Sequence, residues 1–405
     1  MKVAVIGGGA AGFFAAICVK ENYPQASVTI YEKSSKLLSK VKVSGGGRCN
    51  VTNGCTSIAD LLKAYPRGGK ALKKGFHVFS TGDAMHWFSS RGVPLVVQND
   101  NCVFPQSQDS QSIIDCFLRQ AKKLNITIET RSGIASIHTS DDDRLTLEFV
   151  KQDMKPEVFD KVIVATGGSP QRKGLAWLER LNHKIEDPVP SLFTFNIPDT
   201  ALTALQGIVV ENVLVKIQGT KFSASGPLLI THWGMSGPAI LLLSAFGARY
   251  LHAQAYAFTI AVNWVQERNA DIVMTDLAGI ADEHANKILA NFRPYALPDR
   301  LWRYLLEKSG FTPSKRWGEL GKKGMHKLLE VLTHDVYAVR GKTTFKEEFV
   351  TCGGVSLDSV NLDTMQSKVC NNLYFAGEIL DIDGITGGYN FQAAWTTAFI
   401  AAKLG

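Results

Sequence analysis

Residues 2–12, KVAVIGGGAAG, join a short apolar run to a glycine-rich turn near the start of this 405-residue chain. Residues 2–6 are rich in β-branched side chains and predict a buried strand, and the apolar pattern of residues 13–20 predicts a helix. Between them the glycines have the spacing G-x-G-x-x-G, at Gly7, Gly9 and Gly12. In this setting the first glycine permits the tight turn, the second lets the backbone approach a pyrophosphate, and the third allows close helix–strand packing. The stretch therefore predicts an α/β dinucleotide-binding fold.

A second expected strand, residues 27–31, ends at Glu32, which lies 32 − 12 = 20 residues after Gly12. A carboxylate at this distance accepts hydrogen bonds from the ribose hydroxyls of an adenosine and disfavours a 2′-phosphate. The pyrophosphate is expected on the helix N-terminus, where unpaired amides and the positive dipole end favour an anion. This pattern alone does not distinguish FAD from NAD.

Further along the chain, glycines and polar residues follow predicted strands. Residues 43–53, VSGGGRCNVTN, form a loop whose amide, hydroxyl and guanidinium groups suit a polar cofactor. Residues 162–166 and 373–376 predict two more buried strands, followed by Gly167-Gly168 and by Gly377-Glu378, at the sheet edge where ligands bind. Glu378 is placed to accept from a ribityl hydroxyl. Residues 384–391, GITGGYNF, lead into an Ala-rich helix at 392–403, whose N-terminus can stabilise the negative charge of a reduced flavin.

These stretches, together with THWGMSGPAIL at 231–241 and TCGGVSL at 351–357, resemble the HI0933-type family of FAD-binding flavoproteins from end to end. That family, YhiN-like or aminoacetone-oxidase-like, belongs to the two-dinucleotide-binding-domain flavoprotein superfamily. The resemblance implies an α/β fold: a Rossmann-like FAD-binding domain with an inserted β-rich, barrel-like domain and a small helical domain. It also implies FAD as the cofactor and an oxidoreductase acting on a small organic substrate, with NAD(P)H left open as a transient electron donor. The candidate cofactor-binding residues are Gly7, Gly9, Ala10, Ala11, Gly12, Glu32, Lys33, Lys40, Gly46, Gly47, Arg48, Cys49, Asn50, Ala165, Thr166, Gly167, Gly377, Glu378, Gly388, Tyr389, Asn390 and Phe391.

The expected domain limits follow from the resemblance and from breaks in the pattern. The FAD-binding domain is expected at 1–187 and 349–405, the β-rich domain at 188–270 and 333–348, and the helical subdomain at 271–332. Prolines at 188, 190 and 198 mark a break, after which strand-like runs occur at 193–197, 209–217, 221–230 and 256–262. Apolar residues then take the helical period, and residues 343–350 are expected to return through the β-rich part.

Composition sets the broad class. Hydrophobic residues make up 45% and charged residues 20%, typical of a folded globular protein. The net charge of +7 is too mild to indicate nucleic-acid binding. Seven scattered cysteines fit free thiols in a reducing compartment, so a cytoplasmic location is expected. The longest apolar run, residues 238–248, is well short of the roughly 20 residues that cross a bilayer, so no membrane span is expected.

No catalytic side chain emerges, because flavin itself carries out the electron transfer. Cys49 and Cys55 have five residues between them and lack the C-x4-C pattern of disulfide reductases, and no spacing predicts a metal site. Ser236 lacks the surroundings of a nucleophile elbow and is interpreted as a turn residue. Tyr389 and Asn390 are expected nearest the isoalloxazine ring.

Two alternatives stay open beside the oxidoreductase. One is an RNA-acting flavoprotein, on the grounds of basic runs at 63–74 and 315–327, which otherwise represent solvated helix faces. The other is a protein that binds FAD without catalysis. Nucleic acid is not the expected partner, and the sequence does not determine the oligomeric state.

Overall fold

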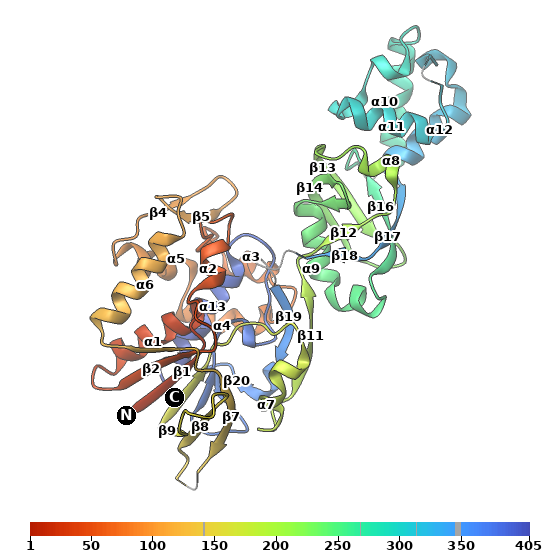
Figure 1. Ribbon diagram of the computed structural model, residues 1–405. Helices are drawn as coiled ribbons and strands as arrows, with labels where there is room; N and C mark the ends of the chain where they lie inside the picture. Colours follow the sequence, from red (N-terminus) through yellow and green to blue (C-terminus); the bar gives the residue numbers. More distant parts are fainter. Residues whose placement is uncertain (141, 268, 313, 345–349) are drawn as a thin grey trace. The chain divides into compact units, whose positions relative to one another are not determined.

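The chain divides into two compact units. In this computed structural model, which describes all residues except 141, 268, 313 and 345–349, unit 1 comprises Met1–Ser191 with residues 350–405. Unit 2 comprises Leu192–Thr344 (Figure 1). The expected boundary between 348 and 349, and most of the expected return strand at 343–350, lie outside the described residues.

A seven-stranded sheet in the order β20-β21-β22-β10-β1-β2-β6 forms the centre of unit 1. β1 (Lys2–Ile6) lies between β10 (Lys161–Val164) and β2 (Ser27–Glu32), parallel to both. β22 (Leu373–Phe375), from the C-terminal part of the chain, pairs parallel with β10, and β6 (Thr127–Thr130) pairs parallel with β2. The short strands β20 (Val360–Asn361) and β21 (Gln366–Ser367) add an antiparallel edge.

Two helices from opposite ends of the chain pack against each other in unit 1, α1 (Ala10–Asn22) and α13 (Tyr389–Ala401). Both are apolar on nearly all sides, as expected for helices buried in a core. Phe14 of α1 meets Trp395 of α13 with ring centroids 5.3 Å apart, and Trp395 also meets Phe117 of α6 (Gln111–Lys123). The two ends of the chain therefore build one core.

Smaller elements surround this core. They are α2 (Ser39–Val43), β3 (Thr52–Asn53), α3 (Ile58–Lys63), α4 (Gly69–Val78), α5 (Thr81–Ser89), β4 (Leu95–Val97), β5 (Cys102–Pro105), β7 (Ile134–Thr139), β8 (Leu145–Phe149), β9 (Glu157–Phe159), α7 (Ala176–Glu179), β11 (Ile185–Ser191) and β19 (Val350–Val355). β11 and β19 form an antiparallel pair. Pro188 and Pro190 lie inside β11, whose last residue, Ser191, is also the last residue of unit 1 before the chain enters unit 2 at Leu192. Pro188 lies where the register shifts between Glu186 and Val189. Pro190 is in regular register with Thr351, but β11 pairs with β19 alone among the described strands, so one side of it is an edge where a proline need not donate a ladder hydrogen bond.

Unit 2 contains a second seven-stranded sheet, in the order β17-β16-β13-β14-β15-β12-β18. Its strands are β12 (Thr194–Asn196), β13 (Val209–Ile217), β14 (Ser223–Thr231), β15 (Gly234–Ser236), β16 (Ala257–Asn263), β17 (Asp335–Arg340) and β18 (Lys342–Thr343). Its helices are α8 (Thr200–Thr203), α9 (Pro238–Ala253), α10 (Ala270–Glu283), α11 (Asp299–Lys308) and α12 (Gly321–Thr333). Ser236 ends strand β15 and is not a turn residue. The helix α9, started by Pro238 at its first position, packs on β14 inside the segment expected to be β-rich.

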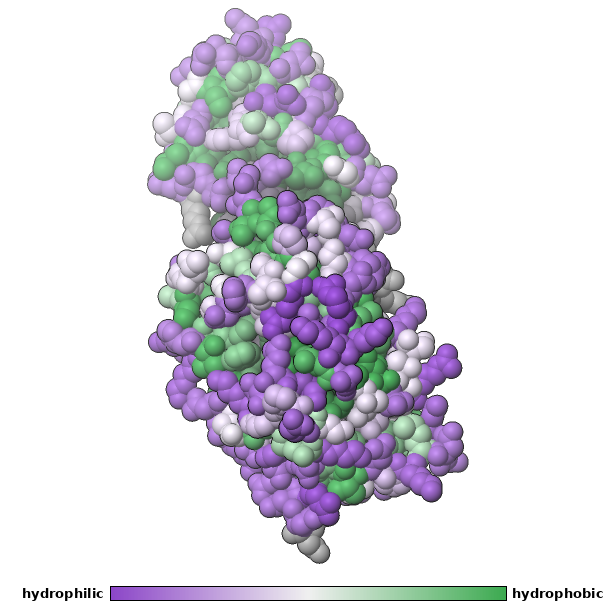
Figure 2. All heavy atoms as spheres, turned by 90° about the vertical axis from the view of Figure 1, so that its left-hand side faces the viewer, coloured by the Kyte–Doolittle hydropathy of each residue, from purple (hydrophilic) through white to green (hydrophobic). Residues whose placement is uncertain are grey.

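No helix among the described residues is long and apolar enough to span a membrane. On the face drawn in Figure 2, hydrophilic side chains cover most of the surface and apolar ones appear as separate patches between them.

Candidate functional site

The turn between β1 and α1 has the close packing that its glycines predict. Gly7 has φ +117°, and a Cβ built on it would lie 2.3 Å from the carbonyl oxygen of Ala165. A Cβ on Gly12 would lie 1.8 Å from the carbonyl oxygen of Gly7. Neither position can carry a side chain without moving backbone. The turn is therefore fixed against the end of β10, where Ala165 and Thr166 follow the strand.

Gly9 differs from these two glycines, because a Cβ built on it would meet no described atom within 4 Å. It is the N-cap of α1, whose helical residues begin with Ala10 and Ala11. The first turn of α1 has no acidic residue and no side-chain cap among the described residues. Open space thus adjoins a helix N-terminus with unpaired amides, which is the arrangement that accepts a pyrophosphate.

Glu32 ends β2 beside this turn. Its Oε2 accepts a hydrogen bond from the Gly8 N–H at 2.9 Å, and its Oε1 accepts one from the Ser34 N–H at 2.8 Å. A carboxylate has about four acceptor positions, so Glu32 retains capacity for ribose hydroxyls. Lys33, the next residue, is exposed, and its Cβ would lie 3.2 Å from a Cβ built on Gly133.

A second carboxylate, Glu378, joins three separated segments. It follows β22 in the short helix Gly377–Ile379. Its Oε1 accepts from the Thr351 N–H at 2.9 Å, and its Oε2 pairs with the Lys40 ammonium of α2. A Cβ built on Gly168 would lie 2.8 Å from Oε1, which places the carboxylate beside the Gly167-Gly168 turn after β10. The expected site residues at the ends of β10 and β22 are therefore neighbours, with Lys40 beside them.

The loop at 44–53 exposes backbone at Gly46 and Gly47, which have φ of +68° and +84° and no described atom within 4 Å of a built Cβ. The Arg48 guanidinium lies over the Phe104 ring, 4.1 Å from its centroid. Asn50 Oδ1 accepts from the Val103 N–H at 3.1 Å. These two contacts hold the loop to β5 and leave its glycine backbone free to face a ligand.

Cys49 in the same loop is fully buried, and burial raises the pKa of its thiol to about 12. The thiol therefore stays protonated, unlike a reactive cysteine. None of the seven cysteines, all of which lie among the described residues, forms a disulfide. Among the described residues no group of three or more His, Cys, Asp or Glu side chains is placed to hold a metal ion.

The same loop meets the N-terminus of α13. Asn53 Nδ2 donates to the Gly387 carbonyl at 3.0 Å. Gly388, the N-cap of α13, has φ +87°, and a Cβ on it would lie 2.2 Å from the Thr52 carbonyl oxygen. The first turn of α13 has no acidic residue. Two segments expected to contact the cofactor, more than 300 residues apart, thus form one surface.

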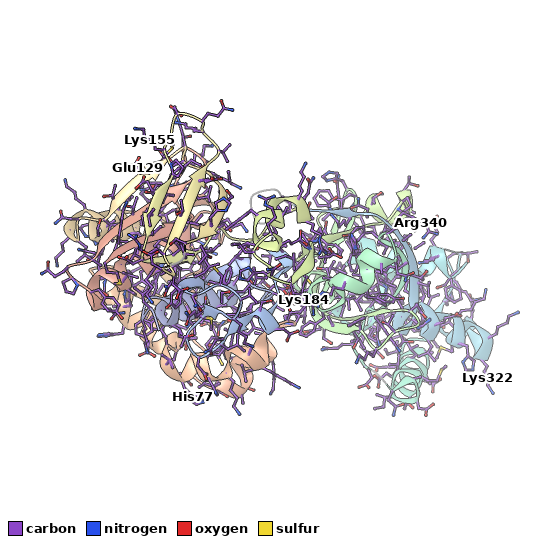
Figure 3. The ribbon with its side chains drawn as sticks, turned by 90° about the horizontal axis from the view of Figure 1, so that it is seen from below. His77, Glu129, Lys155, Lys184, Lys322 and Arg340 are labelled. Atoms are coloured by element: carbon purple, nitrogen blue, oxygen red, sulfur yellow. The ribbon has the colours of Figure 1, made fainter. Side chains whose placement is uncertain are left out.

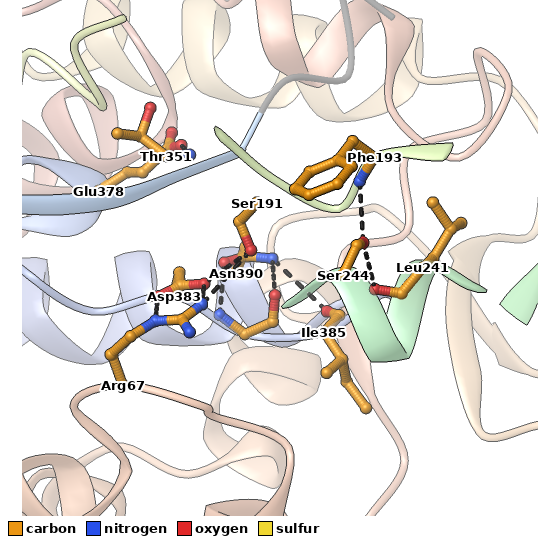
Figure 4. Close-up of polar contacts among 11 residues, drawn as sticks. Arg67, Ser191, Phe193, Leu241, Ser244, Thr351, Glu378, Asp383, Ile385 and Asn390 are labelled. Atoms are coloured by element: carbon orange, nitrogen blue, oxygen red, sulfur yellow. Dashed lines mark hydrogen bonds and ion pairs between the residues drawn. The ribbon is translucent and has the colours of Figure 1, made fainter. Parts of the chain in front are cut away.

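Asn390 and Tyr389 have different surroundings. The Asn390 amide donates to the Gly384 carbonyl at 2.9 Å and accepts from the Gly384 N–H at 2.8 Å, so it holds the loop before α13 (Figure 4). Tyr389 is half-buried, burial raises the pKa of its phenol, and no described residue hydrogen-bonds to its hydroxyl. Phe391 stacks on Trp395 with ring centroids 5.5 Å apart.

Sequence reasoning missed a buried ion pair behind this loop. The Arg67 guanidinium donates two hydrogen bonds to the fully buried Asp383, one from Nε to Oδ1 at 2.6 Å, and the other from Nη2 to Oδ2. The Ser191 hydroxyl donates to the same carboxylate at 2.9 Å (Figure 4). The three residues are too far apart in sequence for any local pattern to connect them. The pair ties the segment between α3 and α4 to the segment that leads into α13, and the Ser191 hydroxyl joins the end of β11 to the same carboxylate.

Comparison with known proteins identifies the family of the chain. A family model described as "HI0933-like protein Rossmann domain" matches residues 1–404. A Clostridium scindens protein named 3-dehydro-bile acid delta(4,6)-reductase is 24% identical over 99% of this chain and 98% of its own length. An Escherichia coli protein named ribosomal RNA dihydrouridine synthase is 27% identical over 98% of this chain and 96% of its own length.

Among solved structures, the 3-ketosteroid-delta4-(5alpha)-dehydrogenase of Rhodococcus jostii is similar in fold, with a TM-score of 0.52 and 12% identity. The similarity covers 99% of this chain and 96% of that one. The fold, the open space at Gly9 and the two carboxylates after parallel strands all fit an FAD-binding protein. The chain belongs to the HI0933-like family and is an FAD-dependent oxidoreductase.

Proposed function

We propose that this enzyme reduces a carbon–carbon double bond conjugated to a carbonyl group in a small organic molecule, with NAD(P)H as the electron donor. The observation that carries the proposal is the chemistry common to the two relatives that match nearly the whole chain. A delta(4,6)-reductase acting on a 3-dehydro bile acid saturates carbon–carbon double bonds next to a ketone. Dihydrouridine differs from uridine by one saturated double bond next to a carbonyl. Both reactions add a hydride to one carbon and a proton to the other.

The candidate cofactor residues of unit 1 would hold FAD along its length. Glu32 would accept from the adenosine ribose, and the amides at Gly9, Ala10 and Ala11 would receive the pyrophosphate. Glu378, held by Lys40, would accept from the ribityl chain. When bound, FAD supplies a two-electron hydride donor. The N-terminus of α13, without an acidic residue in its first turn, favours negative charge beside it.

Tyr389 is our candidate for the proton donor. Its phenol is half-buried at the start of α13 and has no hydrogen-bond partner among the described residues. Any tyrosine phenol carries its proton at neutral pH, and burial raises the pKa of this one further. A Tyr389→Phe variant should therefore lose turnover while its flavin is still reduced by NAD(P)H. Equal turnover of the variant and the wild type would exclude this role.

The test is the visible spectrum of the purified protein under anaerobic conditions, before and after NADH and NADPH. Bleaching of the flavin band by one of them, and its return on adding a steroid-type 4,6-dien-3-one, would support the proposal. A Gly9→Val variant, which fills the space expected for the pyrophosphate, is the control. A flavin that neither nucleotide reduces, but that an amine bleaches, would contradict the proposal and indicate a substrate-reduced oxidase.

A second candidate is reduction of uridine in ribosomal RNA. It is favoured by the identity of 27% and 26% to two proteins named ribosomal RNA dihydrouridine synthase, from Escherichia coli and Haemophilus influenzae. Exposed lysines that pair with no acidic side chain of the described residues lie on α4, at Lys70 and Lys73, and on α12, at Lys322 and Lys323 (Figure 3 labels Lys322). Dihydrouridine formed in ribosomal RNA by the reduced enzyme, with binding that weakens steeply with salt, would favour this candidate over the small molecule.

A further inference from the structure

Thr351 of β19 has a buried hydroxyl without a partner. The residue is 1% exposed, and its Oγ1 has no hydrogen-bond partner among the described residues. Its backbone N–H, in contrast, donates to Glu378 Oε1 at 2.9 Å. Burying a hydroxyl without a hydrogen bond costs free energy, and most buried polar atoms in native proteins are paired. The unpaired oxygen therefore calls for a partner that the described residues do not supply.

The surroundings of this hydroxyl are those of the candidate cofactor site. A Cβ built on Gly168 would lie 2.4 Å from Thr351 Oγ1 and 2.8 Å from Glu378 Oε1. The hydroxyl and the carboxylate thus converge on one point over the turn that follows β10, and Figure 4 draws the two side chains next to each other. Ligands of parallel α/β sheets bind at this carboxyl edge.

Another unpaired buried polar atom of unit 1 lies in quite different surroundings. Trp87 Nε1 also lacks a partner among the described residues, but the Trp87 ring packs against Phe14, Phe88 and Phe117 and beneath the Arg91 guanidinium. The packing of this large aromatic ring explains why the indole N–H of Trp87 is buried without a hydrogen bond. Thr351 has no aromatic ring to pack, and its hydroxyl lies beside the Glu378 carboxylate.

We infer that the Thr351 hydroxyl hydrogen-bonds to the ribityl chain of bound FAD, next to Glu378. A carboxylate only accepts hydrogen bonds, whereas a threonine hydroxyl both donates and accepts, so the two together complement a chain of hydroxyl groups. The hydrogen bond from the Thr351 N–H to Glu378 fixes the two groups relative to each other. The inference rests on FAD as the cofactor. It adds Thr351, the first residue of the TCGGVSL stretch, to the candidate cofactor-binding residues, which did not include it.

The test compares Thr351→Val with Thr351→Ser. Valine removes the hydroxyl at nearly constant volume, so the FAD-free protein should be as stable as wild type or more stable, because an unpaired buried hydroxyl has gone. The affinity for FAD should fall about tenfold, the value of one hydrogen bond. Serine keeps the hydroxyl and should keep most of the affinity. Opposite changes in stability and in affinity are not expected of a merely structural threonine.

Titration of the FAD-free protein with FAD and with ADP, together with thermal unfolding, measures these effects. ADP carries the adenosine and pyrophosphate but no ribityl chain, so Thr351→Val should leave ADP affinity unchanged, whereas Glu32→Gln should weaken it. Equal FAD affinity of Thr351→Val and wild type, or a loss of stability in the FAD-free variant, would overturn the role of Thr351. Failure of the wild-type protein to bind FAD at all would instead overturn the cofactor assignment.

Discussion

Removing either partner of the Arg67–Asp383 pair should destabilise unit 1 more than removing both. Asp383 is fully buried and the Arg67 side chain is 12% exposed, so neither charge is well solvated if the other is lost. Burial raises the pKa of Asp383 although Arg67 lowers it, so the desolvation of this carboxyl outweighs the attraction of its partner. The pair as a whole therefore contributes little net stability, while an unpaired member would be costly.

The magnitude follows from this burial. Asp383→Leu or Arg67→Met alone should reduce the free energy of unfolding by about 3–5 kcal/mol, the range for breaking a buried ion pair. The double variant Arg67→Met/Asp383→Leu should lose much less than the sum of the two. Its remaining loss includes the Ser191 hydroxyl, which donates to Asp383 and would be left without that acceptor.

Urea unfolding of the FAD-free variants, completed as a double-mutant cycle, measures the coupling between the two residues. The Lys74–Asp363 pair of the same unit is the matched control, because its side chains are 79% and 60% exposed. Breaking that pair should cost less than about 1 kcal/mol. Additive losses at Arg67 and Asp383, or single losses as small as those of the control, would refute the argument that burial makes the pair costly to break.

Three further predictions concern other features of unit 1. Gly9→Ala should leave the FAD-free protein stable and weaken FAD binding. Gly12→Ala should instead destabilise the fold itself, because its Cβ would lie 1.8 Å from the Gly7 carbonyl oxygen. Thermal unfolding and FAD titration of both variants separate these outcomes. Glu32→Gln should weaken FAD binding by about 1.5–3 kcal/mol, the value of hydrogen bonds to a charged group, and an unchanged dissociation constant would show that the adenosine lies elsewhere. His183 is buried, donating from Nδ1 to the Leu178 carbonyl and accepting from the Ser367 hydroxyl at Nε2, and burial lowers its pKa. The unfolded chain therefore protonates His183 more readily than the folded protein does, so the free energy of unfolding should fall as the pH drops below about 6.5. Unfolding measured between roughly pH 7.5 and 5.5 tests this, and His183→Gln should remove that part of the pH dependence.

The sequence predicted those parts of the site whose chemistry is local. The turn at 7–12 could be recognised because three glycines at fixed spacing meet three separate steric demands over a few residues. Glu32 could be recognised because the length of one helix and one strand sets its distance from the turn. Strand β13 could be placed at its observed ends, 209–217, because Val213, Val215 and Ile217 recur at every second position, as the buried face of a strand does.

The rest depends on contacts between distant segments. The Arg67–Asp383 pair joins residues 316 positions apart, and nothing near either residue indicates the other. Asn390 was expected near the isoalloxazine ring, but whether an amide serves a ligand or its own backbone depends on the path of the preceding loop. Pro188 and Pro190 suggested a break because proline cannot donate to a ladder. The register shift at Pro188 and the free edge of a two-stranded pair at Pro190 relieve that requirement, and neither can be seen in the sequence.

The pairing of β22 with β10, and of α13 with α1, has a consequence for biosynthesis. A ribosome releases the N-terminal part of unit 1 first and then all of unit 2. Only at the end does it release strand β22, which pairs with β10, followed by Glu378 and helix α13. Unit 2 is continuous in sequence and can fold while the chain is still growing, because domains generally fold as units. Unit 1 must wait, with one edge of β10 unpaired, until the last residues emerge. Capture of the flavin therefore belongs to the final stage of synthesis, and a chain terminated shortly before residue 373 would present an open sheet edge to its neighbours.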